Sequence, residues 1–179
     1  HCSRTPYFTG IGAEFVEFLQ TNPDPDRPYL LELAQYEWAE LALFLDEQSL
    51  PARQEPPPAA QDIPNLLPQL SPLAWPMVFN YAVHEIGPGN EPLAPEAEPV
   101  CLVVYRDVHD AVKFLRVDLF TARLLELIEE AQGLATGMQL IEQLAPEATS
   151  MATTELQSGV CAVLANLHEL DIIRFSFFE

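Results

Sequence analysis

Residues 100–130, "VCLVVYRDVHDAVKFLRVDLFTARLLELIEE", contain the change of period that decides the fold. Apolar and β-branched side chains dominate 100–106 and 111–117, and the short polar "DVHD" between them is typical of a hairpin turn. After this hairpin the apolar residues recur at helical spacing, with Asp118 placed as the N-cap of a helix that ends near Gly133. The stretch therefore predicts a β-hairpin followed at once by an α-helix.

The segments on either side of this stretch extend the pattern. Residues 75–86, "WPMVFNYAVHEI", alternate between two sets of side chains and predict a strand before the hairpin. Two Thr-x-x-Gln capping boxes predict two more helices: Thr136 with Gln139, and Thr154 with Gln157. "IIRFSFF" at 172–178 predicts a last strand. The order βββ-ααα-β over residues 73–179 is that of a winged-helix-like domain.

The first 50 residues have a helical pattern instead. Two helices are predicted, one in "IGAEFVEFLQ" and one from Pro28 to about Asp46, and their apolar surface is too wide for a complete bundle. Residues 1–50 are therefore expected to be the C-terminal part of a larger helical domain. Seven prolines within 51–72 predict a linker between the two domains. The predicted class is α+β.

Glu37 stands out in the second predicted helix. It falls within a broad apolar arc that consists of Leu30, Leu33, Ala34, Trp38, Leu41, Phe44 and Leu45. An unpaired buried carboxylate is costly, so we expect Glu37 to be buried against an arginine, either Arg4 or one outside this sequence. The alternative is that Glu37 and Trp38 contact a partner protein. The structural interpretation is preferred because paired charges are the usual form of buried ionic groups.

The charge balance restricts the partners. The chain has 27 acidic and 8 basic residues, a net charge of −19, which repels phosphate backbones and anionic lipids. No apolar run is long enough to cross a bilayer, so no membrane contact is expected. The three cysteines, without a C-x-x-C, predict reduced thiols and a cytoplasmic protein.

The sequence carries no recognisable catalytic or metal-binding pattern. The sequence has no P-loop, G-x-G-x-x-G, H-E-x-x-H or G-x-S-x-G, and its four histidines are scattered. We therefore expect no metal, no cofactor and no enzymatic activity, and we favour a binding protein.

Two kinds of ligand suit a winged-helix-like domain. DNA readers carry basic or amide side chains on the recognition helix, but here 154–171 contains Glu155, Glu169 and Asp171 and no basic residue, and the wing adds only Arg174. This distribution argues against nucleic acid. The other mode is addition of an extended peptide to a sheet edge beside a helix, which needs open backbone and apolar pockets rather than positive charge. A closed domain with a covered edge is the competing possibility.

A family resemblance is carried by several motifs in a fixed order: "RTPYF", "IGAEFVEFLQ", "PYLLELAQYEWAELAL", "YAVHEI" and "VVYRDVHDAVKFLRVDLFTARLLELIEE". Together they resemble the HvfC-type proteins, often labelled DNA-binding, and cover nearly all of the chain except the linker and the loop after Ile86. The chain has Ala82 and Glu85 where relatives tend to have Pro and Arg.

The resemblance implies a C-terminal domain similar to the PqqD-like peptide-recognition elements of bacterial ribosomal peptide maturation. It further implies a non-catalytic adaptor that binds the leader of a precursor peptide and a partner iron-dependent oxidase that modifies the peptide. In such elements the leader pairs with the strand before the first helix, here Ala111–Val117. The candidate peptide-binding residues are then Lys113, Leu115, Arg116, Val117, Val163 and Leu167. A DNA-binding transcription regulator is the alternative that the family's label suggests.

Overall fold

The computed structural model describes residues 10–50, 57–149 and 151–176. Within them the chain forms helices α1 (Ile11–Thr21), α2 (Leu30–Leu45), α3 (Leu119–Ala131), α4 (Gly137–Leu144) and α5 (Thr153–Glu169). The strands are β1 (Leu67–Leu70), β2 (Ala74–Phe79), β3 (Val100–Arg106), β4 (Val112–Val117) and β5 (Ile173–Ser176), with 3-10 turns η2 (Ile63–Asn65) and η3 (Val83–Glu85). The predicted α+β class is confirmed, and the order βββ-ααα-β runs from β2 to β5.

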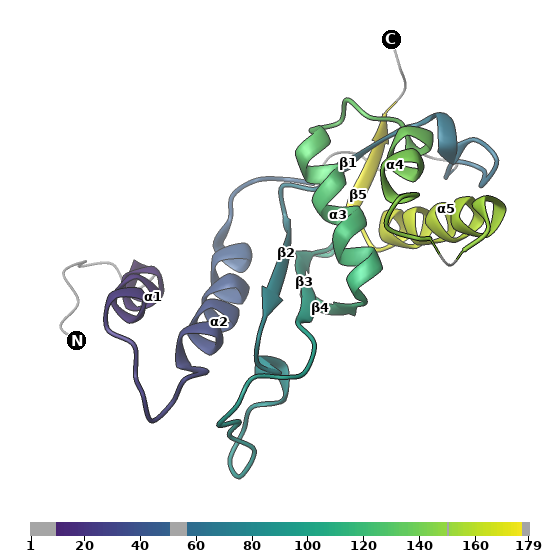
Figure 1. Cartoon of the computed structure of the whole chain (residues 1–179). Helices are drawn as coiled ribbons and strands as arrows, with labels where there is room; N and C mark the ends of the chain where they lie inside the picture. The colour runs from purple at the N-terminus through teal and green to yellow at the C-terminus, as the bar shows by residue number, and fades with distance from the viewer. Residues whose placement is uncertain (1–9, 51–56, 150, 177–179) are drawn as a thin grey trace.

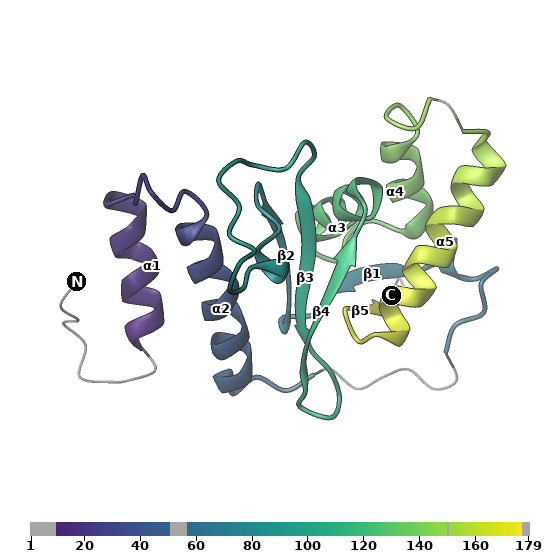
Figure 2. The same cartoon turned by 90° about the horizontal axis from the view of Figure 1, so that it is seen from below.

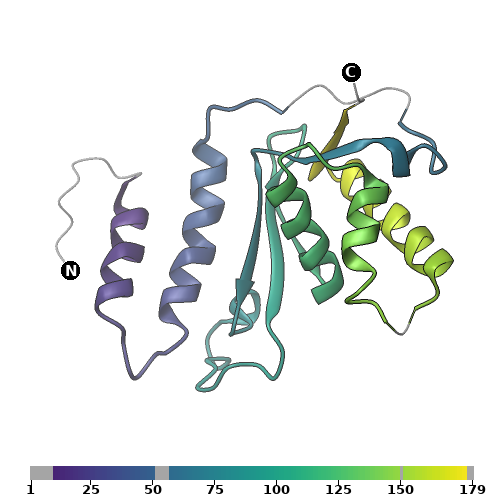
Figure 3. The same ribbon diagram turned by 45° about the horizontal axis from the view of Figure 1, so that its top comes forward.

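Strand β3 lies at the centre of an antiparallel sheet ordered β2-β3-β4. All seven β3 residues are buried because both faces of the sheet are covered. Val103 and Tyr105 face the cluster built by α3, α4 and α5, whereas Leu102 and Val104 face the side on which α2 packs. Figure 1 shows α2 and α3 on opposite sides of this sheet, and Figure 3 gives the same arrangement from another direction. The near-continuous apolar run "VCLVVYR" follows from burial on two faces.

The C-terminal helices begin largely where their caps predict. The Asp118 side chain accepts a hydrogen bond from the Thr121 N–H at 2.7 Å, and Thr136 and Gln139 form the expected capping box. The expected box of Thr154 with Gln157 is wrong by two residues. Helix α5 starts at Thr153, and the Glu155 carboxylate accepts from the N–H of Ala152 at 3.3 Å. An acidic residue in the first turn thus satisfies a free backbone donor there.

The predicted linker contains ordered elements, which corrects the expectation that 51–72 is a linker throughout. Within it, η2 buries Ile63, and β1 pairs antiparallel with β5 in a second, two-stranded sheet, from Leu67 opposite Ser176 to Leu70 opposite Ile173. Pro68 is tolerated because each strand of a two-stranded sheet has a free edge that needs no donor. Strand β1 was not predicted because the segment is rich in proline and because its partner, β5, lies at the other end of the described chain.

Helix α2 packs on the sheet, and α1 packs on α2 from outside. Viewed from below, the layers follow the order α1, α2, sheet and α3 (Figure 2). Ala39 and Leu43 are fully buried against the sheet. The Tyr36 ring lies 4.6 Å from that of Phe114 and 6.4 Å from that of Phe79, between ring centroids. No helix in the described part of the chain is long and apolar enough to cross a membrane.

Candidate functional site

Strand β4 forms one edge of the three-stranded sheet. It pairs with β3 from Cys101 opposite Val117 to Arg106 opposite Val112. On its other side, residues 112–117 make no backbone hydrogen bond to any other described residue. Such an edge presents free N–H and C=O groups that can accept another extended chain. Among the described residues, the structure thus has an open edge at the strand that the family resemblance singled out.

The predicted peptide-binding residues divide between the two faces of β4. Leu115 and Val117 point to the face of α3–α5 and, with Val163 of α5, border the C-terminal core as partly buried side chains. Leu167 is itself core, only 1% exposed, and supports this border from beneath rather than lining an open surface. Arg116 lies on the opposite face, next to Phe114 in the alternation, and its Nη1 is 3.9 Å from Glu85 Oε1.

The turn before β4 is held by Asp107. Its buried carboxylate accepts from Lys113 Nζ at 2.5 Å and from the N–H groups of His109 and Ala111 at 2.9 and 3.1 Å. Burial acts to raise the pKa of Asp107, but these hydrogen bonds outweigh it and hold that pKa below its ordinary value. The same contact raises the pKa of Lys113. Lys113 is therefore already paired, although its side chain is half exposed.

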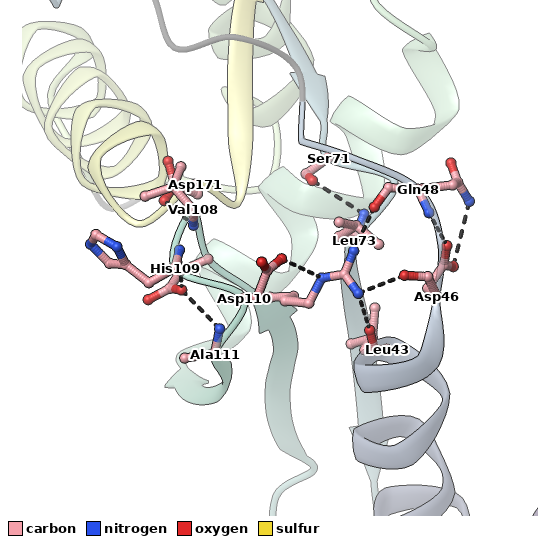
Figure 4. Close-up of polar contacts among 12 residues, drawn as sticks. Leu43, Asp46, Gln48, Ser71, Leu73, Val108, His109, Asp110, Ala111 and Asp171 are labelled. Atoms are coloured by element: carbon pink, nitrogen blue, oxygen red, sulfur yellow. Dashed lines mark hydrogen bonds and ion pairs between the residues drawn. The ribbon is translucent and has the colours of Figure 1, made fainter. Parts of the chain in front are cut away.

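The turn is also tied to the C-terminal part of the chain. Asp110 adopts a positive φ of 58°, which an aspartate tolerates at a tight turn. The N–H of Val108 donates to Asp171 Oδ2 at 3.2 Å (Figure 4). The other Asp171 oxygen accepts from Arg174 at 2.7 Å. The start of β4 is thus fixed relative to α5 and β5.

Arg106, at the end of β3, anchors the C-terminus of α2. Its buried guanidinium donates to the carbonyls of Leu43, Asp46 and Gln48 at 2.9, 2.6 and 2.5 Å, which Figure 4 shows converging on it. The last carbonyls of a helix lack partners within the helix, so this contact satisfies them. This role was not predicted from the sequence. The feature that could have indicated this role is the position of Arg106 at the end of an otherwise apolar strand.

Glu32 anchors the other end of α2. Its carboxylate accepts from the N–H of Asn80 at 2.8 Å, from the Asn80 amide at 2.7 Å and from the N–H of Tyr81 at 2.9 Å. These donors lie just beyond the end of β2, so the helix is joined to the sheet at both ends. This role of Glu32 was not predicted; in this helix the apolar pattern singled out Glu37, as a carboxylate paired with an arginine.

The expectation that Glu37 is buried is wrong. Its side chain is exposed and makes no hydrogen bond or ion pair within the described ranges, and the suggested partner Arg4 lies outside them. Burial raises the pKa of the Tyr36 hydroxyl, and the nearby charges of Glu37 and Glu40 raise it further. Glu37 is exposed because its side of α2 lines a groove rather than the buried contact with the sheet, although Leu33 and Trp38 of the same arc still touch residues of the sheet. Trp38, also on this arc, lies 5.7 Å from Trp75 between ring centroids.

The arc faces a groove of about 790 Å³. Its floor is α2, and its two walls are α1, through Gly12 and Phe15, and the turn before β4, through Asp110 and Ala111. A Cβ on Gly12 would lie 3.0 Å from Trp38 Cδ1, so the absence of a side chain there lets α1 approach α2 closely. The groove is the second candidate site of the described chain.

Other reactive groups are enclosed. Cys101 and Cys161 are free and buried, and burial raises the pKa of both thiols. His84 lies in the 3-10 turn η3 rather than in the predicted strand, and its Nε2 is 3.4 Å from Glu85. Among residues 10–50, 57–149 and 151–176, no group of three or more His, Cys, Asp or Glu side chains is placed to hold a metal ion.

Comparison with known proteins gives one family. Residues 71–168, more than half of the chain, match the family model described as the HvfC C-terminal domain. The match begins just before β2 and ends near the end of α5, so it includes the sheet, the β4 edge and the three C-terminal helices. No curated protein shows significant similarity to the chain.

Proposed function

Because this chain belongs to the HvfC family, whose domain indicates an accessory protein, we propose that it is a non-catalytic adaptor of bacterial ribosomal peptide maturation. In this proposal it binds the leader of a precursor peptide and presents the peptide to an iron-dependent oxidase. The observation that carries the proposal is the open edge of β4, with partly buried apolar side chains beside it.

Binding by strand addition explains how one edge recognises a peptide. The leader's backbone pairs with the free groups of β4 and supplies affinity that does not depend on sequence. Every second leader side chain then lies over the α3–α5 face, next to Leu115, Val117 and Val163, and the apolar character of this border supplies specificity. An acidic leader residue competes with Asp107 for the exposed side of Lys113.

The alternative, a DNA-binding regulator, has no supporting observation in the described part of the chain. Each arginine and lysine there lies within 4.0 Å of a carboxylate: Arg27, Arg106, Lys113, Arg116, Arg123 and Arg174. Phosphate contacts require cations that are available to the nucleic acid. Helix α5, which carries Glu155 and Glu169, adds no cation that is free to contact a phosphate. The charges thus favour a peptide ligand over DNA.

The proposal is tested by titrating the chain with the precursor peptide encoded beside its gene. We expect Leu115→Asp and Val163→Asp to weaken leader binding at least about tenfold, because a charge in an apolar pocket must be desolvated. Val78→Asp is the matched control. Val78 is 65% exposed and lies on the same face of the sheet, but on the opposite edge strand, β2.

Hydrogen exchange of the unmodified protein provides a second measurement that does not depend on the variants folding. Leader binding should slow exchange of amides within 112–117, while the β2 amides stay unchanged. Protection at β2, or loss of binding in Val78→Asp alone, places the leader at the other edge and contradicts the proposal. A protein that ignores the leader but shifts duplex DNA well below about 10⁻⁴ M favours the regulator.

A further inference from the structure

The three-stranded sheet has two edges, β2 and β4, and its hydrogen-bond ladder shows which backbone groups each edge turns outward. In an antiparallel pair, residues that exchange hydrogen bonds alternate with residues whose N–H and C=O groups point away from the partner strand. The Arg106 N–H donates to the Leu73 carbonyl at 2.9 Å, and the Asp107 N–H donates to the Ala111 carbonyl at 3.0 Å. These two bonds fix the alternation on both sides of β3, the middle strand in Figure 2.

The β4 edge turns three complete residues outward. Counting from Ala111, every second residue of β4 bonds to β3, and the outward-facing residues are Val112, Phe114 and Arg116. None of their three N–H groups and three carbonyls has a backbone partner among the described residues. An extended peptide therefore finds a donor and an acceptor at each outward position of this edge.

The β2 edge offers fewer donors. Counting from Leu73, its outward-facing residues are Ala74, Pro76 and Val78. The N–H of Ala74 donates to the Ser71 carbonyl at 3.0 Å, and Pro76, as a proline, has no N–H. Among the described residues, Val78 is then the one outward residue of β2 whose N–H exists and has no backbone partner. A proline is accepted at this position because the ladder with β3 takes no bond from it.

Contacts within the chain close the far end of the β2 edge. The next outward position is Asn80, whose N–H donates to the Glu32 carboxylate at 2.8 Å and whose carbonyl accepts from the Glu96 N–H at 2.7 Å. Between the two ends, Val78 is 65% exposed, so the middle of the edge is accessible to a peptide. A peptide carbonyl placed opposite Pro76 would lose its water without gaining a donor, which lowers affinity.

We propose that Pro76 determines which edge of the sheet receives an extended peptide, because it withholds from β2 a donor that β4 offers. The identity of that peptide, the leader, rests on the proposed function, whereas the hydrogen-bonding argument applies to any extended chain. One net hydrogen bond changes affinity roughly fivefold, so two donors fewer make β2 about 25-fold weaker than β4 before side chains contribute. The backbone thus selects the edge, and the side chains select the sequence.

The test uses a probe without leader sequence, a capped octapeptide of alternating valine and lysine, whose cations suit a chain of net charge −19. Its position is measured by amide NMR, as slower solvent exchange of individual edge residues. In the unmodified protein we expect slower exchange at Phe114 and Arg116 but not at Val78. In Pro76→Val, which supplies the missing N–H, Val78 should become protected as well. Pro95→Val, the same change in the exposed loop between η3 and β3, should behave like the unmodified protein.

A reciprocal pair of variants moves the proline to the other edge. Arg116→Pro removes one outward donor of β4 without removing a bond to β3, whereas Arg116→Val removes the same charge and keeps the donor. The Arg116 side chain is 64% exposed, so neither change disturbs the core. We expect the octapeptide to bind Arg116→Pro at least about fivefold more weakly than Arg116→Val. Equal affinities would mean that backbone donors do not decide where the peptide binds.

Two results at β2 also overturn the proposal: protection of Val78 in the unmodified protein, or its absence in a Pro76→Val protein that thermal melting shows to be folded. If Pro76→Val does not fold, the two Arg116 variants decide. Protection of neither edge in any variant overturns the proposal too. The leader is titrated separately. If the octapeptide follows the expected pattern but the leader protects neither edge, the adaptor role fails and the assignment of Pro76 stands.

Discussion

Both long faces of α2 carry apolar side chains, but the two faces have opposite surroundings. On one face, Tyr36, Ala39 and Leu43 pack against the sheet, and Leu43 is fully buried. On the other, Phe44, the very next residue, is 64% exposed over the groove. Apolar character therefore does not identify the core face of this helix. The face is chosen by the contacts that hold the helix ends, since these fix its rotation about its own axis.

Two glutamates of α2 show the same difference. Glu32 accepts three hydrogen bonds from Asn80 and Tyr81, whereas Glu37 accepts none from the described residues. Five residues apart on a helix, the two side chains point about 140° apart, so only one of them reaches the donors after β2. The lesson is that a carboxylate in a helix is explained by the donors near it rather than by its apolar neighbours.

The largest expected effect on the free energy of unfolding is the difference between two alanine substitutions, one on each face of α2. Leu43→Ala should lower the free energy of unfolding by about 3 kcal/mol, because it leaves a cavity against the sheet. Phe44→Ala should change it by less than about 0.5 kcal/mol, because that ring is mostly in solvent already. Urea unfolding monitored by circular dichroism measures both. Equal losses would mean that the groove face is as tightly packed as the sheet face.

An intermediate effect is expected at the C-terminal anchor. Arg106→Met should cost about 2 kcal/mol, since it leaves buried carbonyls at the end of α2 without a charged donor. The control is Arg116→Met on the adjacent strand, whose exposed ion pair should contribute less than about 0.5 kcal/mol. Thermal melts of the two variants make the comparison. A stable Arg106→Met protein would show that packing alone holds α2 in place.

The smallest effect is expected for the two glutamates. Glu32→Gln should lose about 1 kcal/mol, because an amide presents one acceptor oxygen to donors that now occupy both carboxylate oxygens. Glu37→Gln should stay within about 0.5 kcal/mol of the unmodified protein, as for other exposed substitutions. Chemical unfolding of both variants in the same buffer compares their free energies of unfolding. A larger loss for Glu37 would restore the interpretation that it is a buried, paired charge.

Local patterns predicted much of the C-terminal region. The hairpin of β3 and β4, the N-cap at Asp118 and the capping box at Thr136 all depend on residues a few positions apart, and all are present in the structure. The proline-rich segment was misread for the opposite reason. Strand β1 exists because it pairs with β5, roughly a hundred residues later, and no local pattern reports such a partner.

The candidate sites were predicted to different extents. The β4 edge strand follows from the hairpin pattern together with the family resemblance, and the structure leaves its outer edge open. The arginine and glutamate that anchor α2 were not predicted, since their partners are backbone groups on other elements. The groove residues were recognised as an apolar arc, but its exposure was not.

The sequence by itself determined the period of each main element, several helix caps and the acidic character that argues against DNA. These properties depend on neighbouring residues or on simple sums. Only the tertiary structure decided which side of α2 meets the sheet, which glutamate is bonded, and that β1 joins β5. Each of those choices requires groups distant in the chain to meet with correct geometry, and the hydrophobic effect, which is non-directional, does not select among them without the hydrogen bonds of Glu32 and Arg106.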